Sequence, residues 1–344
     1  MREVRLGRTD LMVSEVGFGG IPIQRLSEDE AIRVVRRSIE LGVTMIDTAN
    51  GYGTSEERIG RAIAGRREGL ILATKSPARD GQRFRQNLET SFERLCVEHI
   101  DLFQFHNVAT EEAYQQIQVP GGPLDIAREA KASNRIGHIG VSSHSPELSL
   151  EMVKSGNFET LMFPFNFVTD EAVERLLPAC RENDVGFIAM KPLGGGVLEN
   201  ATLVFKYLRQ FPDIVSIPGI ETIGEIEEIV SIMEGPGELT PEERAEMERI
   251  RRDMGTRFCR RCGYCEPCPQ GIDISVMMHL RSFAKRFSAE MIFGEWGRRV
   301  VDRVEQCADC GECEDKCPYA LPIREVIAEN VVWYEQEMAK HTGS

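Results

Sequence analysis

The sequence predicts an α/β protein: a (β/α)8 TIM barrel followed by a smaller, mostly helical domain. Eight short apolar runs, each followed by a helical pattern, fit into about 235 residues, the usual length of such a barrel. Two cysteine runs come after them in a region without strand patterns. We therefore expect two domains, residues 1–238 and residues 239–344, near a Gly/Pro break at 234–237.

The predicted strands begin after a hairpin. Residues 2–13 alternate in polarity around a turn, which predicts a hairpin that closes the bottom of the barrel. An open doubly wound sheet is the weaker alternative, because no GxGxxG motif opens a helix after a strand. The eight barrel strands are expected near residues 14–18, 44–48, 70–75, 100–106, 138–142, 160–165, 185–190 and 214–218.

Capping signals mark several helix starts. Ser27 and Glu30 have the spacing of a capping box, and this helix should end near Leu41. Proline at the first helical position predicts a linking helix that starts after Thr240 and ends near Met254. Further helical patterns occupy residues 84–95 and 171–181.

Composition excludes several classes of function. The net charge of −14 argues against nucleic acid as a partner. The sequence has no run of 18 apolar residues, and its first ten residues are rich in charge, which argues against a membrane span or a secretory signal. We expect a cytoplasmic protein whose ten cysteines serve metal or redox chemistry rather than disulfides.

Three successive apolar runs end in reactive side chains. Asp47 and Tyr52 follow the first run, Lys75 ends the second, and His106 ends the third. The carboxyl ends of all strands of a parallel barrel face one mouth, so these four residues should form one catalytic site. The alternative, a lysine in solvent and a histidine in the core, does not explain four coincident positions.

This set of groups suits reduction of a carbonyl or oxidation of an alcohol. Transfer of a hydride to a carbonyl builds an alkoxide that must be protonated, and a phenol is too weak an acid without help. An ammonium at Lys75 would stabilise the tyrosinate of Tyr52, since lowering its pKa from about 10 to about 7 requires about 4 kcal/mol. Asp47 would keep the lysine charged, and His106 would donate to the substrate oxygen.

The two cysteine runs are the strongest signal in the sequence. Each offers three thiols in a C-x2-C-x2-C turn and a fourth before a proline, which predicts two 4Fe-4S clusters. Two structural zinc sites are the alternative. Arginines beside the first run could raise a cluster potential or offset its charge: Arg257, Arg260 and Arg261. The metal-binding cysteines are Cys259, Cys262, Cys265, Cys268, Cys307, Cys310, Cys313 and Cys317, whereas Cys96 and Cys180 should be buried thiols.

Residues 1 to about 235 resemble the aldo-keto reductase family, on the four strand-end residues, the PGGPLDIAREAKASNRIGHIGVSSH stretch and IPGI near residues 217–220. The C-terminal region resembles a bacterial two-cluster ferredoxin, in which the fourth cysteine of each run binds the other cluster. That resemblance implies one cluster on Cys259, Cys262, Cys265 and Cys317, and another on Cys307, Cys310, Cys313 and Cys268. The first run departs from the pattern, because its last spacing is two residues instead of three.

The resemblance also implies where a nicotinamide would bind, although the pattern is altered there. The Ser-Asn pair of the family is Ser142 and Ser143 here. Glu221 and Glu225 stand where members specific for NADPH place basic groups, so NAD(H) is favoured over NADP(H); FMN is the alternative cofactor, because barrel phosphate sites lie after strands seven and eight. The other expected cofactor-binding residues are Gly19, His144, Lys191, Gly194, Gly195 and Gly219.

Together these features predict an iron-sulfur oxidoreductase. The barrel would reduce or oxidise a small carbonyl or alcohol compound, and the clusters would exchange electrons with a redox partner protein. Two alternatives stay open at this point: an electron-transfer or assembly subunit with an inactive barrel, and an ordinary NAD(P)H carbonyl reductase with structural clusters.

Overall fold

The computed structural model describes residues 1–255 and 257–342. The chain divides into two compact units, each described here by itself. The first unit is Met1–Gly194 with Leu198–Thr240, and the second is Gly195–Val197 with Pro241–Ser344.

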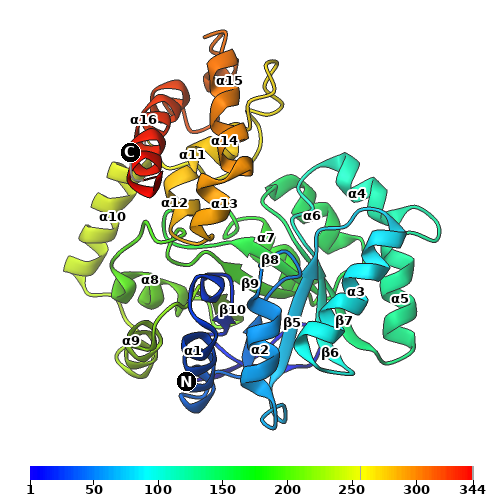
Figure 1. Ribbon diagram of the computed structural model, residues 1–344. Coiled ribbons are helices and arrows are strands. Elements are labelled where there is room, and N and C mark those ends of the chain that lie inside the picture. The colour runs from blue at the N-terminus through cyan, green and yellow to red at the C-terminus, as the bar shows by residue number, and fades with distance from the viewer. Residues whose placement is uncertain (256, 343–344) are drawn as a thin grey trace. The chain divides into compact units, whose positions relative to one another are not determined.

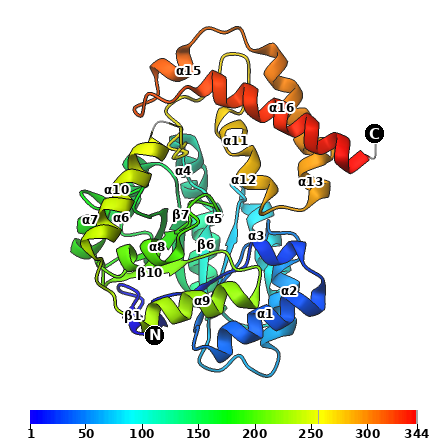
Figure 2. The same cartoon turned by 90° about the vertical axis from the view of Figure 1, so that its left-hand side faces the viewer.

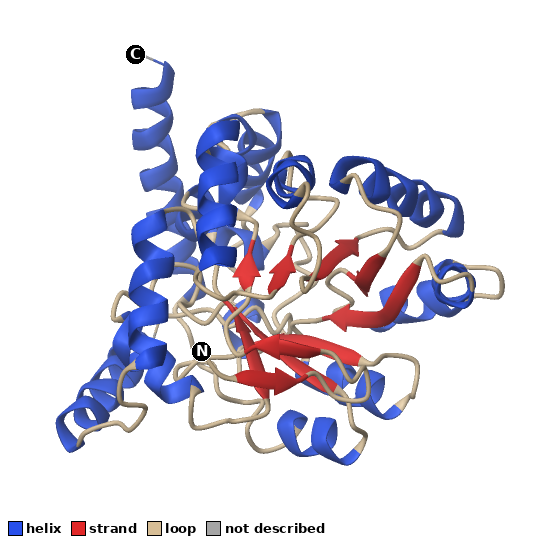
Figure 3. Cartoon of the chain, turned by 90° about the horizontal axis from the view of Figure 1, so that it is seen from below, coloured by secondary structure: helices blue, strands red, loops and turns tan. Residues whose placement is uncertain are grey.

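The first unit is a (β/α)8 barrel, as the sequence predicts. Its eight strands are parallel and lie in sequence order from β3 to β10, with helices outside them (Figures 1 and 3). Isolated bridges between Val16 and Ser216 and between Gly19 and Gly219 close the ring. The strands are β3 (Phe18–Gly19), β4 (Met45–Asp47), β5 (Ile71–Ser76), β6 (Ile100–Phe105), β7 (Ile136–Ser142), β8 (Thr160–Pro164), β9 (Gly186–Met190) and β10 (Ile214–Ile217).

The predicted N-terminal hairpin is confirmed. The antiparallel strands β1 (Glu3–Arg5) and β2 (Met12–Ser14) place Val4 and Val13 in one apolar cluster with the inward side chains of the barrel strands. That cluster fills the barrel interior, with Met45, Ala73, Leu102, Met162, Ile188, Val215 and Ile217 among its members. Because the interior is packed, chemistry is left to the carboxyl ends of the strands.

The predicted capping box at Ser27 is confirmed. The box of Ser27 and Glu30 is formed in both directions at the start of α1, and Thr222 and Glu225 form a second one at α9. The helices of this unit are α1 (Glu28–Glu40), α2 (Ser55–Ile63), α3 (Gly81–Leu95), α4 (Glu111–Gln118), α5 (Pro123–Ala132), α6 (Pro146–Lys154), α7 (Leu176–Glu182), α8 (Ala201–Leu208) and α9 (Ile223–Glu234), with a short 3-10 helix at Pro22–Arg25.

Three local predictions were wrong. Only Phe18–Gly19 forms strand β3, because Ser14 belongs to the hairpin and Val16 makes a single bridge. Helix α7 begins at Leu176 rather than near residue 171, after a series of turns. Cys96 is exposed instead of buried, because it caps α3 in the left-handed conformation (φ 54°) and so leaves the apolar face of that helix. Cys180 is buried as expected, and burial raises the pKa of its thiol to about 12.

The second unit is helical, as its sequence predicts. A cluster of buried residues holds it together, including Met277, Leu280, Ile292 and Tyr334. The last helix, α16, is the long red helix of Figure 2, and α11 packs against it. The helices are α10 (Pro241–Gly255), α11 (Ile274–Met278), α12 (Leu280–Ala284), α13 (Ala289–Phe293), α14 (Glu295–Asp302), α15 (Glu312–Asp315) and α16 (Ile323–Thr342), with a 3-10 helix at Arg303–Gln306.

Within residues 1–255 and 257–342, none of the helices is both long and apolar enough to cross a bilayer.

Candidate functional site

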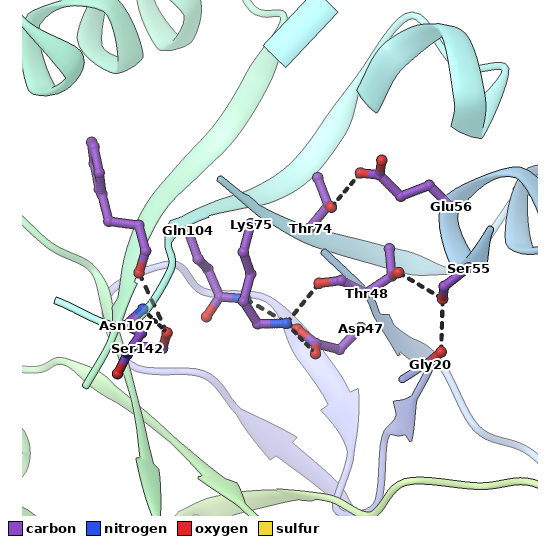
Figure 4. A network of polar contacts seen from close by, with 11 residues as sticks. Gly20, Asp47, Thr48, Ser55, Glu56, Thr74, Lys75, Gln104, Asn107 and Ser142 are labelled. Carbon is purple, nitrogen blue, oxygen red and sulfur yellow. Dashed lines mark hydrogen bonds and ion pairs between the residues drawn. The ribbon is translucent and has the colours of Figure 1, made fainter. Parts of the chain in front are cut away.

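Lys75 and Asp47 form a buried ion pair at the carboxyl ends of two neighbouring strands, β5 and β4. Lys75 Nζ donates to Asp47 Oδ1 at 2.5 Å and to the carbonyl of Thr48 at 2.6 Å (Figure 4). The lysine is 1% exposed and the aspartate 3%. A buried lysine needs such oxygen partners to stay charged, and the strand ends provide them.

The pair governs the charge of both side chains. Burial is the largest effect on Lys75 and opposes its charge, but Asp47, Tyr52 and Glu56 together outweigh burial, and the pKa of Lys75 is raised. Burial raises the pKa of Asp47, against the opposing effects of Lys75 and Gln104. The site therefore keeps an ammonium at neutral pH, which is what stabilisation of a neighbouring anion requires.

Tyr52 and His106 lie beside this ammonium. Lys75 Nζ lies 5.1 Å from the centroid of the Tyr52 ring. The rings of Tyr52 and His106 meet edge to face, with their centroids 5.5 Å apart. The structure thus brings all four predicted strand-end residues together, with Tyr52 and His106 half-buried above the fully buried pair.

Gln104 is a member of this site that the sequence analysis missed. It lies on β6, is fully buried, and its Nε2 donates to Asp47 Oδ2 at 3.1 Å (Figure 4). Asp47 therefore accepts from Lys75 on one oxygen and from Gln104 on the other. A glutamine between two phenylalanines near the end of a strand, two residues before His106, was the available signal.

A polar chain runs across the mouth of the barrel after strands β6, β7 and β9. Ser142 Oγ accepts from the backbone amide of Asn107 at 2.8 Å. Asn107 Oδ1 lies 2.8 Å from His144 Nδ1, and Lys191 Nζ lies 2.8 Å from His144 Nε2. A charged Lys191 must donate, so His144 accepts on Nε2 and carries its proton on Nδ1. Two members of this polar chain, Asn107 and Lys191, adopt left-handed backbone conformations (φ 55° and 53°).

The glycines expected at the cofactor divide into two groups. Gly19 and Gly219 approach each other across the closure of the barrel, and a Cβ at Gly19 would lie 2.5 Å from the carbonyl oxygen of Pro218. Their absence of a side chain thus has a structural reason. Gly194 and Gly195 have positive φ (58° and 75°) in a turn, and the Gly195 carbonyl accepts from Ser282 at 3.0 Å inside the second unit.

The start of α9 carries a carboxylate. Glu225 Oε2 accepts from the amides of Glu221 and Thr222 at 2.7 and 2.9 Å. These amides are the donors with which a helix start binds a phosphate. In this protein they donate instead to the Glu225 carboxylate, which is negatively charged like a phosphate.

In the second unit the cysteines surround two cavities rather than one ion. Within the described part of the chain, no three His, Cys, Asp or Glu side chains converge on the position of a single metal ion. The first cavity, of about 20 Å³, is lined by Cys259, Cys262, Cys265 and Cys317. The second cavity, of about 260 Å³, is lined by Cys265, Cys268, Cys307, Cys310 and Cys313. Each set combines cysteines of both runs. Soft thiols are the donors that iron-sulfur clusters take.

Curated proteins match more than half of the chain. Among curated proteins, the uncharacterized oxidoreductase YqkF of Bacillus subtilis is 31% identical over 217 residues, which are 59% of this chain and 68% of the relative. The L-galactose dehydrogenase of Arabidopsis thaliana is 29% identical over 209 residues, 56% of this chain and 66% of the relative. The chain thus spans about two thirds of the length of these relatives.

Solved structures show the same fold. The aldo-keto reductase AKR11C1 from Bacillus halodurans, in its holo form, superposes with a TM-score of 0.63 at 24% identity, covering 73% of this chain and 96% of that one. An aldo/keto reductase from Klebsiella pneumoniae in complex with NADP and acetate gives 0.60 at 21% identity, over 72% and 94%.

Family models match the two regions separately. The model of the aldo/keto reductase family matches residues 15–204, which is more than half of the chain. The model of a 4Fe-4S dicluster domain matches residues 258–322. The chain therefore belongs to the aldo/keto reductase family of oxidoreductases and carries a 4Fe-4S dicluster domain on the C-terminal side of its barrel.

Proposed function

We propose that this oxidoreductase interconverts a small carbonyl compound and its alcohol in the barrel and exchanges electrons through two 4Fe-4S clusters with a redox partner protein. One observation carries the proposal: a buried ammonium, Lys75, lies 2.5 Å from Asp47 and 5.1 Å from the Tyr52 ring, with His106 at the edge of that ring. These are the groups that protonate an alkoxide as it forms.

Each residue of the site has a distinct role in this proposal. Tyr52 donates the proton to the carbonyl oxygen, and the positive charge of Lys75 stabilises the phenolate that is left. Asp47 holds the lysine charged and oriented, and Gln104 binds the other oxygen of Asp47. His106 donates to the substrate oxygen and orients the carbonyl. In the reverse direction Tyr52 accepts the proton of the alcohol.

A nicotinamide, when bound, would supply or accept the hydride. Ser142, Ser143, His144, Lys191 and Gly194 lie at or after the strand ends of the barrel that are expected to bind it. The carboxylate of Glu225 at the start of α9 supports NAD(H) over NADP(H), because it repels a 2′-phosphate. The Klebsiella pneumoniae structure contains NADP, whereas no comparison supports FMN.

The second unit would hold the clusters on crossed ligand sets. Cys259, Cys262, Cys265 and Cys317 line the first cavity and fit one cluster. Cys307, Cys310, Cys313 and Cys268 line the second and fit the other. When bound, such clusters supply transfer of single electrons. Cys307 and Cys310 are exposed, so the second cavity is the one that a redox partner can approach.

One observation favours a second candidate, a carbonyl reductase whose clusters are only structural. Cys259, Cys265, Cys268, Cys313 and Cys317 pack against the apolar core of the second unit. Clusters bound there would contribute to folding even without carrying electrons.

Anaerobic reoxidation separates these candidates. The clusters of the full-length protein are first reduced, and a panel of small carbonyl compounds is then added with and without NAD(H). The proposal predicts that a carbonyl restores the absorbance of the oxidised clusters, with one alcohol formed for every two electrons and two protons consumed. If the clusters stay reduced while NADH alone drives alcohol formation, the clusters are structural. Reduced clusters without any alcohol formed would indicate an electron carrier with an inactive barrel.

A further inference from the structure

The two cysteine cavities differ in the charged side chains around them. Arg260 and Arg261 line the first cavity, and its described lining contains no carboxylate. The second cavity is lined by two acids and two bases: Asp309, Glu312, Lys316 and Arg324. These bases are paired, since Lys316 Nζ binds Glu312 at 2.9 Å and Arg324 binds Asp309 at 2.6 Å and Glu314 at 2.7 Å. The lining of the first cavity is therefore cationic, while that of the second is balanced.

Arg261 lines the first cavity in an unfavourable backbone conformation. Its φ of 59° lies in the left-handed region, which is unfavourable for a residue with a Cβ. Its backbone amide donates to Cys259 Sγ at 3.4 Å. Its Nε is buried and has no hydrogen-bond partner among the residues that the structure describes. Its guanidinium carbon lies 5.2 Å from the centroid of the Phe283 ring.

The acids near Arg261 are engaged elsewhere. Glu266 and Asp273 are within electrostatic reach of Arg261. Glu266 accepts from the amide of Ser275 at 2.9 Å, and Asp273 accepts from the amide of Val276 at 3.1 Å. A buried cation without a direct anionic partner is unfavourable, unless a negative group in the cavity beside it compensates its charge.

We propose that Arg261, with Arg260 beside it, makes the cluster of the first cavity the more oxidising of the two, so that a single electron in the domain resides there. This inference rests on the proposed function, which assigns one cluster to each cavity. Reduction adds one negative charge to a cluster, and a nearby cation and an N–H···S bond both favour the reduced form. Arg260 adds to this field, with its guanidinium 3.9 Å from the centroid of the Tyr319 ring in the same lining.

Solvent acts in the opposite direction. Cys307 and Cys310 are exposed, and water around the second cavity also stabilises a reduced cluster. Water, however, screens charge, whereas the Arg261 guanidinium acts in the interior, where the Coulomb interaction is several times stronger. The cationic lining should therefore dominate.

A redox titration of the anaerobically reconstituted full-length chain, followed by electron paramagnetic resonance, tests this inference. The wild type should show two separate one-electron midpoints. Arg261→Met should reduce the reduced-to-oxidised ratio of the higher-potential cluster about tenfold at a fixed potential, a shift of about 59 mV. The lower midpoint should stay in place, and Arg261→Lys should retain the wild-type order.

Two further variants complete the test. Arg260→Met should lower the same midpoint, and it replaces Arg261→Met if that variant does not contain the full iron and sulfide. Arg324→Met, beside the second cavity, should leave the higher midpoint unchanged. Unchanged midpoints in the Arg260 and Arg261 variants, or a shift of the lower midpoint only, would overturn the inference while the proposed clusters stand. A protein without iron and sulfide would overturn the proposed function itself.

Discussion

Gln104 Nε2 donates to Asp47 Oδ2 at 3.1 Å, on the oxygen opposite to the one that Lys75 binds. The bond favours the ionised form of Asp47, whose pKa burial raises. In the proposed reaction Gln104 therefore acts through Asp47 and Lys75, as a positioning residue of the site.

Gln104→Met should lower kcat about tenfold, since a hydrogen bond to a charged group contributes about 1.5–3 kcal/mol. Without this donor the pKa of Asp47 rises further, so the acidic limb of the kcat profile should move to higher pH. The profile is measured by steady-state turnover between pH 5 and pH 9. Thr160→Val is the control, because it removes a buried hydroxyl that has no hydrogen-bond partner among the described residues. A loss of kcat without a shift of the limb would indicate a merely structural role for Gln104.

Lys75→Met should destabilise the barrel by about 3 kcal/mol at pH 7, because it leaves a buried carboxylate without its cation. Asp47→Asn together with Lys75→Met should cost less than the sum of the single changes. The pKa of Lys75 is raised, so the stabilisation that its charge provides is present below the ordinary lysine pKa and is lost as the pH rises through the raised value. At the acidic end the pairing ends when Asp47 is protonated, and burial raises the pKa of that carboxyl. Urea unfolding at several pH values measures both effects. Additive costs of the two changes would contradict the pairing. So would a difference in unfolding free energy between the wild type and Lys75→Met that grows at high pH.

Glu225→Gln should improve the use of NADPH about tenfold in kcat/KM and leave NADH almost unchanged. Glutamine retains the capping box at α9 but removes the charge that a 2′-phosphate would meet. Glu228→Gln, one turn later on the exposed side of the same helix, is the matched control. A wild-type preference for NADPH would show that the phosphate binds elsewhere.

Much of the barrel could be predicted, because its strands are apolar runs that end at polar residues. Asp47, Lys75 and His106 mark three such ends, and a parallel barrel brings these together whatever the sequence between them. The capping box at Ser27 could be predicted equally well, since both of its partners lie within one turn.

The remaining features depend on contacts between distant segments. Gln104 donates a hydrogen bond to Asp47, 57 residues away in the sequence, and no local pattern predicts that partner. The chain from Asn107 through His144 to Lys191 forms only once strands β6, β7 and β9 are side by side. Gly19 and Gly219 were expected at the cofactor, but the close approach that explains them joins the first and last strands of the ring.

The central claim is that Tyr52, beside the ammonium of Lys75, donates the proton that makes the barrel a working carbonyl reductase. Steady-state reduction of a carbonyl panel by NADH under anaerobic conditions, in the wild type and in Tyr52→Phe, tests it most directly. Tyr114→Phe, a buried tyrosine on α4, controls for the loss of a hydroxyl elsewhere in the barrel. The account predicts wild-type turnover that Tyr52→Phe lowers at least about 100-fold, with Tyr114→Phe unchanged. Turnover that survives Tyr52→Phe, or a wild type that reduces no carbonyl while its clusters accept electrons, would contradict it.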